Sequence, residues 1–304
     1  MKKNHEAVQV FGLGQACVDY RGRLATYPNE DEKTELTDLF MECGGPASTA
    51  LVTLARLNVP TSFLGSISND LFGEIITKHL KEEGVDTSCL TVTPGYTSQY
   101  AFIAITEKSG NRTIFRHKGS VPHLKPEQID IGRFPNARFL HLDGLMVEAS
   151  CEAARQAKAL GMKVVLDGGT MREGTRELLS LVDILVASET FAKPLMAGHH
   201  RDALYALHEL GPEQVVITLG SKGSIGLNNQ ELITVEAFEV DALDTTGAGD
   251  VYHGAYIYGL LQKWHMKECM RFASAAAALK CRKTGSQSGI PRLGEIDGLI
   301  GSIF

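Results

Sequence analysis

Asp244-Thr-Thr-Gly-Ala-Gly-Asp250-Val-Tyr-His-Gly-Ala255 is the stretch that decides how the rest of the sequence is interpreted. Its three small residues Gly247, Ala248 and Gly249 form a tight turn, and an apolar helix follows that we expect to begin near Asp250. Free backbone N–H groups at a helix start, together with the helix dipole, bind anions. Glycine is needed because a side chain in such a turn would keep a phosphate group away from the backbone. The stretch therefore predicts a phosphate-binding turn.

Asp250 has two interpretations when it is taken alone. An aspartate at a helix start commonly caps the helix by accepting a backbone N–H. Beside a bound phosphate donor, the same carboxylate can accept the proton of an attacking hydroxyl group. The adjoining glycines favour the second interpretation. His253 follows one helical turn later, where it either lines the phosphate site or packs in the core.

Short apolar runs alternate with amphipathic helical segments along most of the chain. This alternation is typical of an α/β fold, in which helices cover both faces of a mostly parallel sheet. The 304 residues are enough for one such domain, spanning 1–304. We expect strands at 8–11, 62–66, 138–142, 163–167, 184–187 and 215–219. We expect helices at 47–57, 72–83, 148–160, 189–196, 201–210, 251–262 and 267–281.

Two stretches interrupt this alternation. Residues 19–41 have no helical period, and residues 98–105 and 112–116 are predicted to form a β-hairpin through the turn-rich loop 107–111. A small antiparallel sheet built from the segments 19–41 and 95–118 would lie over the strand ends of the main sheet. Ligands bind at those strand ends in open α/β folds. We interpret the small sheet as a lid.

The composition excludes several classes of partner. The formal net charge is −6 and no Lys/Arg-rich run is present, which argues against nucleic acid and anionic membranes. The six cysteines lack the CxxC spacing of metal or redox sites, so we expect reduced thiols. Neither a signal peptide nor a membrane-spanning apolar run is apparent, and we expect a cytoplasmic protein.

The segment 244–257 resembles the second signature of the PfkB family, the ribokinase-like sugar and nucleoside kinases. Other stretches are similar to that family in the same order along the chain, namely 14–19, 65–73, 218–223 and 285–291. The ending 271–291 is similar in texture to the family's ketose and sugar-acid kinase branches. The resemblance implies a ribokinase-like fold and an ATP-dependent carbohydrate kinase.

The resemblance also implies roles for individual residues. Asp250 matches the general base, and the N–H groups of Gly247, Ala248 and Gly249 match the anion hole. Gly247 and Gly249 also match ATP contacts, together with Thr218, Gly220, Ser221 and Gly223. The positions that grip sugar hydroxyls in the family match Asp19, Gly44, Gly45, Ser48 and Asp143. Arg116 either reaches an acidic or phosphorylated substrate or is a solvated charge at a strand end.

Two kinds of metal ion are implied by the same resemblance. Mg²⁺ would bridge the nucleotide phosphates. A monovalent cation, K⁺, would be held near the turn by the positions Asp244, Thr246, Lys280, Gly285 and Gly289. The chain departs from the family pattern at Ser48, where an Asn is usual, and at Ser188 and Phe191, where an Asn and a Glu organise magnesium. Glu189 is the carboxylate left in that magnesium region.

Three functions remain open from the sequence. The first is a kinase that transfers the γ-phosphate of ATP to a hydroxyl of a free ketose, aldose or sugar acid. The second is a kinase of the same family acting on a nucleoside, a vitamin alcohol or a sugar phosphate. The third is a non-catalytic sugar-binding module, against which the intact Asp250 and its glycines argue. An apolar face of the lid would be exposed to solvent unless another surface buries it, so we also predict a homodimer in which the lids of two copies contact each other.

Overall fold

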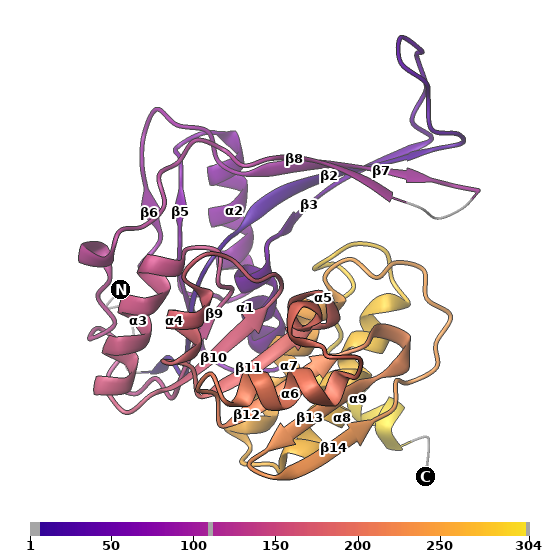
Figure 1. The fold of residues 1–304 in the computed structure, drawn as a ribbon. Coiled ribbons are helices and arrows are strands. Elements are labelled where there is room, and N and C mark those ends of the chain that lie inside the picture. The colour runs from indigo at the N-terminus through magenta and orange to yellow at the C-terminus, as the bar shows by residue number, and fades with distance from the viewer. Residues whose placement is uncertain (1–6, 109–111, 302–304) are drawn as a thin grey trace.

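The computed structural model describes residues 7–108 and 112–301. Its central sheet has eight strands in the order β14-β13-β12-β11-β10-β9-β1-β4 (Figure 1). The six parallel strands match the six that the apolar runs predict: β1 Val10–Leu13, β4 Thr61–Leu64, β9 Phe139–Leu142, β10 Lys163–Gly168, β11 Ile184–Ser188 and β12 Gln214–Thr218. Two antiparallel strands that were not predicted extend the sheet, β13 Ser224–Asn228 and β14 Glu231–Val235.

Helices cover both faces of this sheet, which confirms the predicted α/β class. Alternate strand residues enter two separate cores, Val165 on one face and its neighbours Val164 and Leu166 on the other. The first core receives α1 Pro46–Arg56, α2 Leu71–Glu82, α7 Ala248–Leu261, α8 Met266–Cys281 and α9 Leu293–Gly301. The second receives α3 Val147–Ala159, α4 Thr175–Leu179, α5 Glu189–Ala192 and α6 His200–His208.

The predicted helices all form, with shifted ends. The segment predicted as one helix at 189–196 divides into α5 and a 3₁₀ turn, η3 Lys193–Leu195, because Pro194 has no N–H to continue the α-helical ladder. Helices α4 and α9 were not expected. Two further 3₁₀ turns are η2 Pro126–Gln128 and η4 Gly220–Lys222. No helix in the described ranges is long and apolar enough to cross a membrane.

A separate small sheet has the strand order β3-β2-β7-β8 and lies across the top of Figure 1. Its strands are β2 Cys17–Leu24, β3 Asp38–Gly44, β7 Tyr100–Thr106 and β8 Arg112–His117. The predicted hairpin forms as the antiparallel pair β7–β8, and residues 109–111 of its loop lie outside the described residues. The expectation of a wholly antiparallel sheet is wrong, because β2 and β7 pair in parallel. A parallel pair needs a long crossover, here the chain from 25 to 99.

The short strands β5 Ser66–Ile67 and β6 Thr91–Val92 form a two-stranded parallel sheet. In the main sheet, β1 lies between β4 and β9, so the chain leaves β1 toward one side and later resumes on the other. Ligands bind beside the carboxyl ends of the strands where an open α/β sheet changes direction in this way. Asp143 directly follows β9, and Asp167 lies near the end of β10. The topology thus gathers carboxylates at one edge of the sheet.

Candidate active site

The start of α7 has the geometry of an anion-binding turn. Gly247 precedes the helix with φ of 74°, a conformation that favours glycine. The helix begins at Ala248, earlier than expected, and Asp250 is its third residue. No side chain caps this end, so the capping interpretation of Asp250 is wrong for this structure. A methyl group built on Gly249 would meet no described atom within 4 Å, which leaves open space for a ligand beside the turn.

Asp250 lies among other carboxylates at the strand ends. Burial, followed by the charges of Asp167, Asp143 and Asp19, raises the pKa of Asp250 to about 7. Only His253 among the named neighbours opposes this shift of the pKa. A carboxylate whose pKa is near 7 is a better acceptor for a hydroxyl proton than an ordinary aspartate, yet it is still largely ionised just above neutral pH.

His253 is buried beneath this cluster. Its Nε2 lies 3.1 Å from Oδ1 of Asp167, which identifies a pairing role and not a place in the lining of the phosphate turn. Burial acts to lower the pKa of His253, but the charges of Asp167 and Asp250 outweigh it and raise the pKa above the ordinary value. The ring of His141 lies 6.0 Å from that of His253, and burial with this neighbour lowers the pKa of His141 to about 3. His253 therefore binds a proton more readily than His141 does.

Asp19 and Asp143 occupy space that glycines leave for them. A methyl group on Gly44 would collide with Oδ2 of Asp19, and one on Gly14 would collide with Oδ2 of Asp143. Asp143 accepts the N–H groups of Gln15 at 2.6 Å and of Leu145 at 3.0 Å, so it fixes two turns. Burial nevertheless raises its pKa to about 7. A carboxylate offers about four lone-pair positions, which is enough to accept a substrate hydroxyl in addition to backbone N–H groups.

Gly45 and Ser48 stabilise the backbone around the first turn of α1. Gly45 has φ of 104°, and a side chain there would collide with the carbonyl of Gln15. Ser48 is fully buried, and its hydroxyl donates to the carbonyl of Gly44 at 2.6 Å. It also accepts a hydrogen bond from Nε2 of Gln287 at 3.3 Å. These contacts connect α1 to the loop 285–291, and the sugar-binding role of Ser48 stays a prediction.

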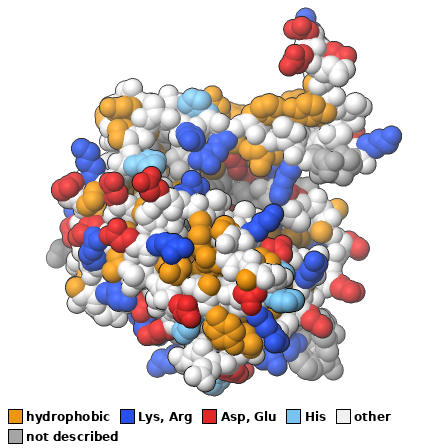
Figure 2. Space-filling view, viewed as in Figure 1, with side chains coloured by type: hydrophobic (Ala, Val, Ile, Leu, Met, Phe, Trp, Pro, Cys, Tyr) orange, Lys and Arg blue, Asp and Glu red, His pale blue; other side chains and the backbone are white. Residues whose placement is uncertain are grey.

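Arg116 lies on the same face of the small sheet as Asp19. The strand register pairs Asp19 with Ala101 and Ala101 with Arg116, and directly paired residues point to one side of a sheet. Two strand spacings separate Asp19 from Arg116, about 10 Å. The surface is hollowed beneath the small sheet, and Lys and Arg side chains gather around the hollow (Figure 2). Arg116 is exposed on the edge strand β8, and its reach toward a substrate stays a prediction.

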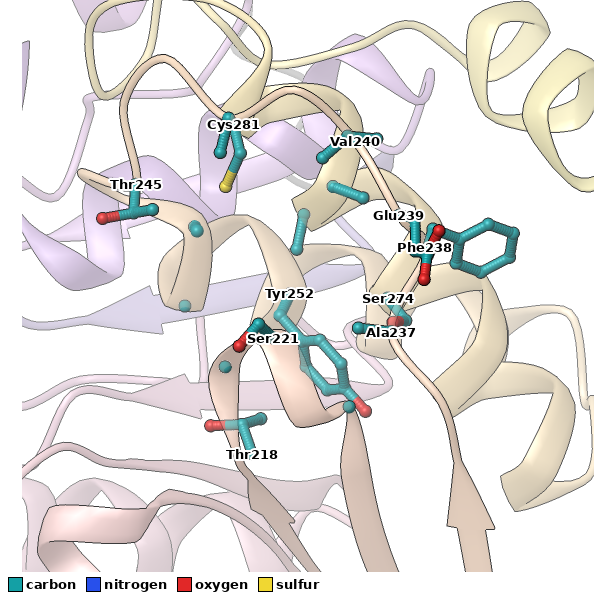
Figure 3. A pocket seen from close by; sticks show the side chains of 17 residues that line it. Thr218, Ser221, Ala237, Phe238, Glu239, Val240, Thr245, Tyr252, Ser274 and Cys281 are labelled. Carbon is teal, nitrogen blue, oxygen red and sulfur yellow. The ribbon is translucent and has the colours of Figure 1, made fainter.

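A cavity of about 500 Å³ opens beside the start of α7. Thr218 and Ser221 lie on one side of it, and the segment from Ala237 to Val240 lies on the other (Figure 3). The four residues predicted from the nucleotide loop all line it: Thr218, Gly220, Ser221 and Gly223. Ala277 and Ala278 of α8 give an apolar wall, and Ala248 and Gly249 bring the anion turn to one end. Its size and lining suit a nucleotide whose phosphates meet the turn.

The predicted magnesium region has a different local structure. The Ser188 hydroxyl accepts the N–H of Phe191 at 3.1 Å and caps α5, and the Phe191 side chain is in the core. The Glu189 carboxylate lies 2.6 Å from Nε2 of His200. The described residues hold no group of three or more His, Cys, Asp or Glu side chains arranged for a metal ion. They do not fit a magnesium cage built by the protein, and the role of Glu189 stays a prediction.

Asp244 contacts three of the other residues predicted around the monovalent cation, namely Thr246, Lys280 and Gly285. Its Oδ1 accepts the N–H of Thr246 at 2.9 Å, and its Oδ2 accepts the N–H of Gly285 at 2.8 Å. Arg21 of β2 donates to the same Oδ2, and the ammonium of Lys280 donates to the Asp244 carbonyl at 2.7 Å. Burial acts to raise the pKa of Asp244, but the hydrogen bonds from Thr246 and the charge of Lys280 outweigh it and lower the pKa to about 2.

Several residues of the site were not predicted from the sequence. Arg21 pairs with Asp244 and Glu42, and Arg112 of β8 donates to the Thr246 hydroxyl at 2.6 Å. Asp167 pairs with His253. A two-residue period links Asp19 to Arg21, which puts both on one face of β2, so this signal could have identified Arg21. Asp167 ends a predicted strand as Asp143 does, which is a similar signal.

Comparisons with known proteins agree with this geometry. The model of the pfkB family carbohydrate kinases matches residues 9–293. The chain is 32% identical to a ribokinase of Haemophilus influenzae, over 82% of this chain and 84% of that protein. It is 30% identical to a 5-dehydro-2-deoxygluconokinase of Shouchella clausii, over 96% of this chain and 95% of that protein. The structure of Arabidopsis thaliana ribokinase complexed with ribose and ATP matches with a TM-score of 0.86, at 26% identity over 97% and 99% of the two chains.

The family match spans nearly the whole chain, and the relatives that it resembles are named as kinases of sugars or sugar acids. The enzyme is therefore a phosphotransferase with an alcohol group as acceptor. This chain belongs to the pfkB family of carbohydrate kinases.

Proposed function

We propose that this kinase transfers the γ-phosphoryl group of ATP to a hydroxyl group of a free sugar or sugar acid, with Asp250 as the general base. The position of Asp250 carries the proposal. It lies in the first turn of α7, next to the anion turn and its nucleotide-sized cavity. The carboxylates of Asp19 and Asp143 lie near enough to raise its pKa. A proton acceptor between a phosphate site and hydroxyl-binding carboxylates suits phosphoryl transfer to a sugar.

The proposed reaction follows from these positions. Asp19 and Asp143 accept hydrogen bonds from sugar hydroxyls and orient the acceptor oxygen. Asp250 takes the proton of that hydroxyl as the new O–P bond forms, while the bond from the γ-phosphorus to the leaving oxygen of ADP breaks. The N–H groups at the start of α7 stabilise the negative charge on the transferred group. Magnesium accompanies ATP in kinases of this family and, bound to the phosphates, neutralises part of their charge.

The variant Asp250→Asn tests the catalytic assignment. Asparagine keeps the shape of the side chain but cannot accept the proton, so kcat should fall by about three orders of magnitude or more. ADP release in the presence of sugar measures kcat, and the KM for ATP should change by less than about threefold. A transfer rate close to that of the wild type would contradict the assignment.

The stability of this variant provides its control. The folded state raises the pKa of Asp250, so above the ordinary aspartate pKa the folded protein binds more protons than the unfolded chain. Ionisation of Asp250 therefore lowers the free energy of unfolding as the pH rises from the ordinary aspartate pKa to about 7, and this loss is complete above the folded-state pKa. Asn is not ionised, so Asp250→Asn should melt at the same temperature as the wild type at pH 8 or at a higher one.

Arg116 favours an acceptor that carries a negative group. A screen of ketoses, aldoses, sugar acids and nucleosides with ATP and magnesium would identify the acceptor class. We expect Arg116→Ala to lower kcat/KM for a sugar acid at least tenfold and to change that for a neutral sugar less than about twofold. Lys78→Ala on the exposed side of α2 is the matched control. Efficient phosphorylation of nucleosides alone, or an equal effect of Arg116→Ala on all acceptors, would contradict the proposal.

The outer face of the small sheet supports the proposal of a homodimer. One row across its four strands is Met41, Tyr20, Phe102 and Phe115, by the strand register. Met41 and Phe115 are 49% and 51% exposed at the two ends of this row. In Figure 2 hydrophobic side chains form a band along the small sheet. An apolar face of this kind is commonly covered by another protein surface, and we propose that a second copy of the chain covers it.

A further inference from the structure

Lys280 is a fully buried lysine beside the proposed phosphate turn. It lies in the last turn of α8 with no exposed surface, and its ammonium donates to the carbonyl oxygen of Asp244 at 2.7 Å. Lysine is rarely buried to this extent, because an ammonium loses its hydration unless a partner replaces it. The general reaction above does not use this side chain. Its burial against a single functional turn therefore needs an explanation.

Hydrogen bonds lead from Lys280 to the start of α7. The ammonium holds the carbonyl of Asp244, and the Cys281 carbonyl accepts the N–H of Asp244 at 3.1 Å. The Asp244 carboxylate in turn accepts the N–H of Thr246 at 2.9 Å, directly before Gly247. The last turn of α8 thus fixes the backbone that presents the anion turn. A positive charge is also favourable at this carboxyl end of α8.

The same contacts leave little for a potassium ion to bind. Two of the carbonyls that would coordinate it have donors already: Asp244 accepts the Lys280 ammonium, and Lys280 accepts the N–H of Lys283 at 3.1 Å. A methyl group built on Gly289 would lie 3.4 Å from Cε of Lys280, so the lysine side chain passes through the region between the predicted ligands. The residues present do not fit the implied K⁺.

The charges around Asp244 also disfavour a bound potassium ion. Asp244 and Glu42 are the two carboxylates of this cluster, and both bind the buried Arg21. Arg112 lies 3.6 Å from Oδ1 of Asp244 and Lys280 contacts its carbonyl, so three cations already surround two anions. A further cation would be repelled in a region that excludes most water.

We propose that the Lys280 ammonium takes the place of a monovalent cation and positions the phosphate turn, so that this kinase works without K⁺. The inference rests on the proposed function only for its activity assay. Lys280 is a positioning residue, since it acts through Asp244. The expectation of a potassium ion at this site is replaced by a charge that the protein carries itself.

The wild-type enzyme gives the first test. Its kcat and its KM for ATP should agree within about twofold in chloride buffers of K⁺, Na⁺ and tetramethylammonium at equal ionic strength. Activation by K⁺ of about fivefold or more would overturn the proposal. This test needs no variant, so it does not depend on whether a changed protein folds.

Two variants give the second test. Lys280→Ala removes the ammonium and leaves space beside the Asp244 carbonyl, so activity in tetramethylammonium should fall at least tenfold and recover on addition of K⁺ or NH₄⁺. Lys280→Met fills most of that space without a charge, so its activity should fall and K⁺ should not restore it. An equal loss in every salt for Lys280→Ala, with a wild-type circular dichroism spectrum, would overturn the positioning role.

A melting experiment separates this proposal from the proposed function. Without any substrate, K⁺ should raise the melting temperature of Lys280→Ala and leave that of the wild type unchanged. No such rise in Lys280→Ala would count against the inference, even if the protein is an active sugar kinase. Failure of the wild type to phosphorylate any sugar would refute the proposed function, while a K⁺-dependent melting temperature in the variant would still support the role of Lys280.

Discussion

At the scale of single residues, the site depends on where charge is buried. The pKa of Asp250 is raised to about 7, whereas that of Asp244 is lowered to about 2. The two aspartates are only six residues apart, Asp244 in the loop before α7 and Asp250 in the first turn of that helix. Burial acts to raise the pKa of both, and the neighbours add to this effect at Asp250 and outweigh it at Asp244. Carboxylates surround Asp250, whereas hydrogen-bond donors and cations surround Asp244. One side chain is thereby suited to accept a proton and the other to hold a permanent charge.

The raised pKa of Asp250 predicts an acid limb in the pH profile. The base works only when ionised, so kcat/KM should rise with pH up to about 7 and level off above it. His253 lowers the pKa of Asp250 by its charge, so His253→Gln should move this limb to higher pH. Initial rates between pH 5 and 9 measure both. Because Asp143 also has a pKa of about 7, the apparent value belongs to the group of carboxylates.

A limb near the ordinary pKa of aspartate, with no displacement in His253→Gln, would contradict this account. Tyr205→Phe on the exposed side of α6 provides a control that leaves the buried charges alone. Its pH profile should coincide with that of the wild type.

At the scale of elements, the start of α7 combines a helix and a binding turn. Gly249 lies within the helix, where alanine would stabilise it by about 1 kcal/mol, and a methyl group there meets no described atom within 4 Å. That methyl group would occupy the space proposed for phosphate. Gly249→Ala should therefore raise the melting temperature slightly and lower kcat/KM for ATP at least tenfold.

Gly298 of α9 offers a matched control for this prediction. A methyl group built there also meets nothing within 4 Å, and α9 lies outside the residues that line the nucleotide cavity. Gly298→Ala should stabilise the protein without a change in kinetics. If Gly249→Ala kept wild-type kcat/KM for ATP, the turn would not be the phosphate site.

The helices and strands differ in how well the sequence predicts them. Parallel strands buried on both faces, such as β10 and β11, have continuous apolar runs and were found within a residue or two. Strand β14 does not alternate strictly, because Glu231 and the apolar Leu232 are both exposed, and α4 has only five residues, so neither gives a clear period. The pairing of β2 with β7 joins residues about 80 apart, and no local pattern reports such a contact.

The residues of the candidate site also differ in how well the sequence predicts them. The turn at 247–249 with Asp250 is contiguous, so its residues could be identified together. The contacts of Asp244 with Arg21 and Lys280 span 223 and 36 residues, and they depend on how the small sheet and α8 meet the turn. The magnesium region could not be settled from its residue types, because the pairing of Glu189 with His200 depends on how α5 packs on α6.

At the scale of the whole molecule, the proposed dimer follows from the part of the outer face of the small sheet that α2 leaves exposed. Phe115 lies at the edge of this sheet and is half exposed, so Phe115→Asp should place a charge in the contact between copies. Sedimentation at micromolar concentration should give a dimer for the wild type and a monomer for this variant. Tyr205→Asp, on α6, is the control and should remain dimeric. A monomeric wild type would contradict the proposal.

The Asp244 carboxylate joins segments that are distant in the chain. Arg21 comes from the first strand of the small sheet, and Gly285 comes from the loop after α8. During synthesis Arg21 leaves the ribosome before Asp244, but the turn before α7 stays without Lys280 and Gly285 until those residues have emerged. A nascent chain that already contains Asp250 therefore lacks a formed phosphate site. Unfinished molecules of this kinase should not consume ATP.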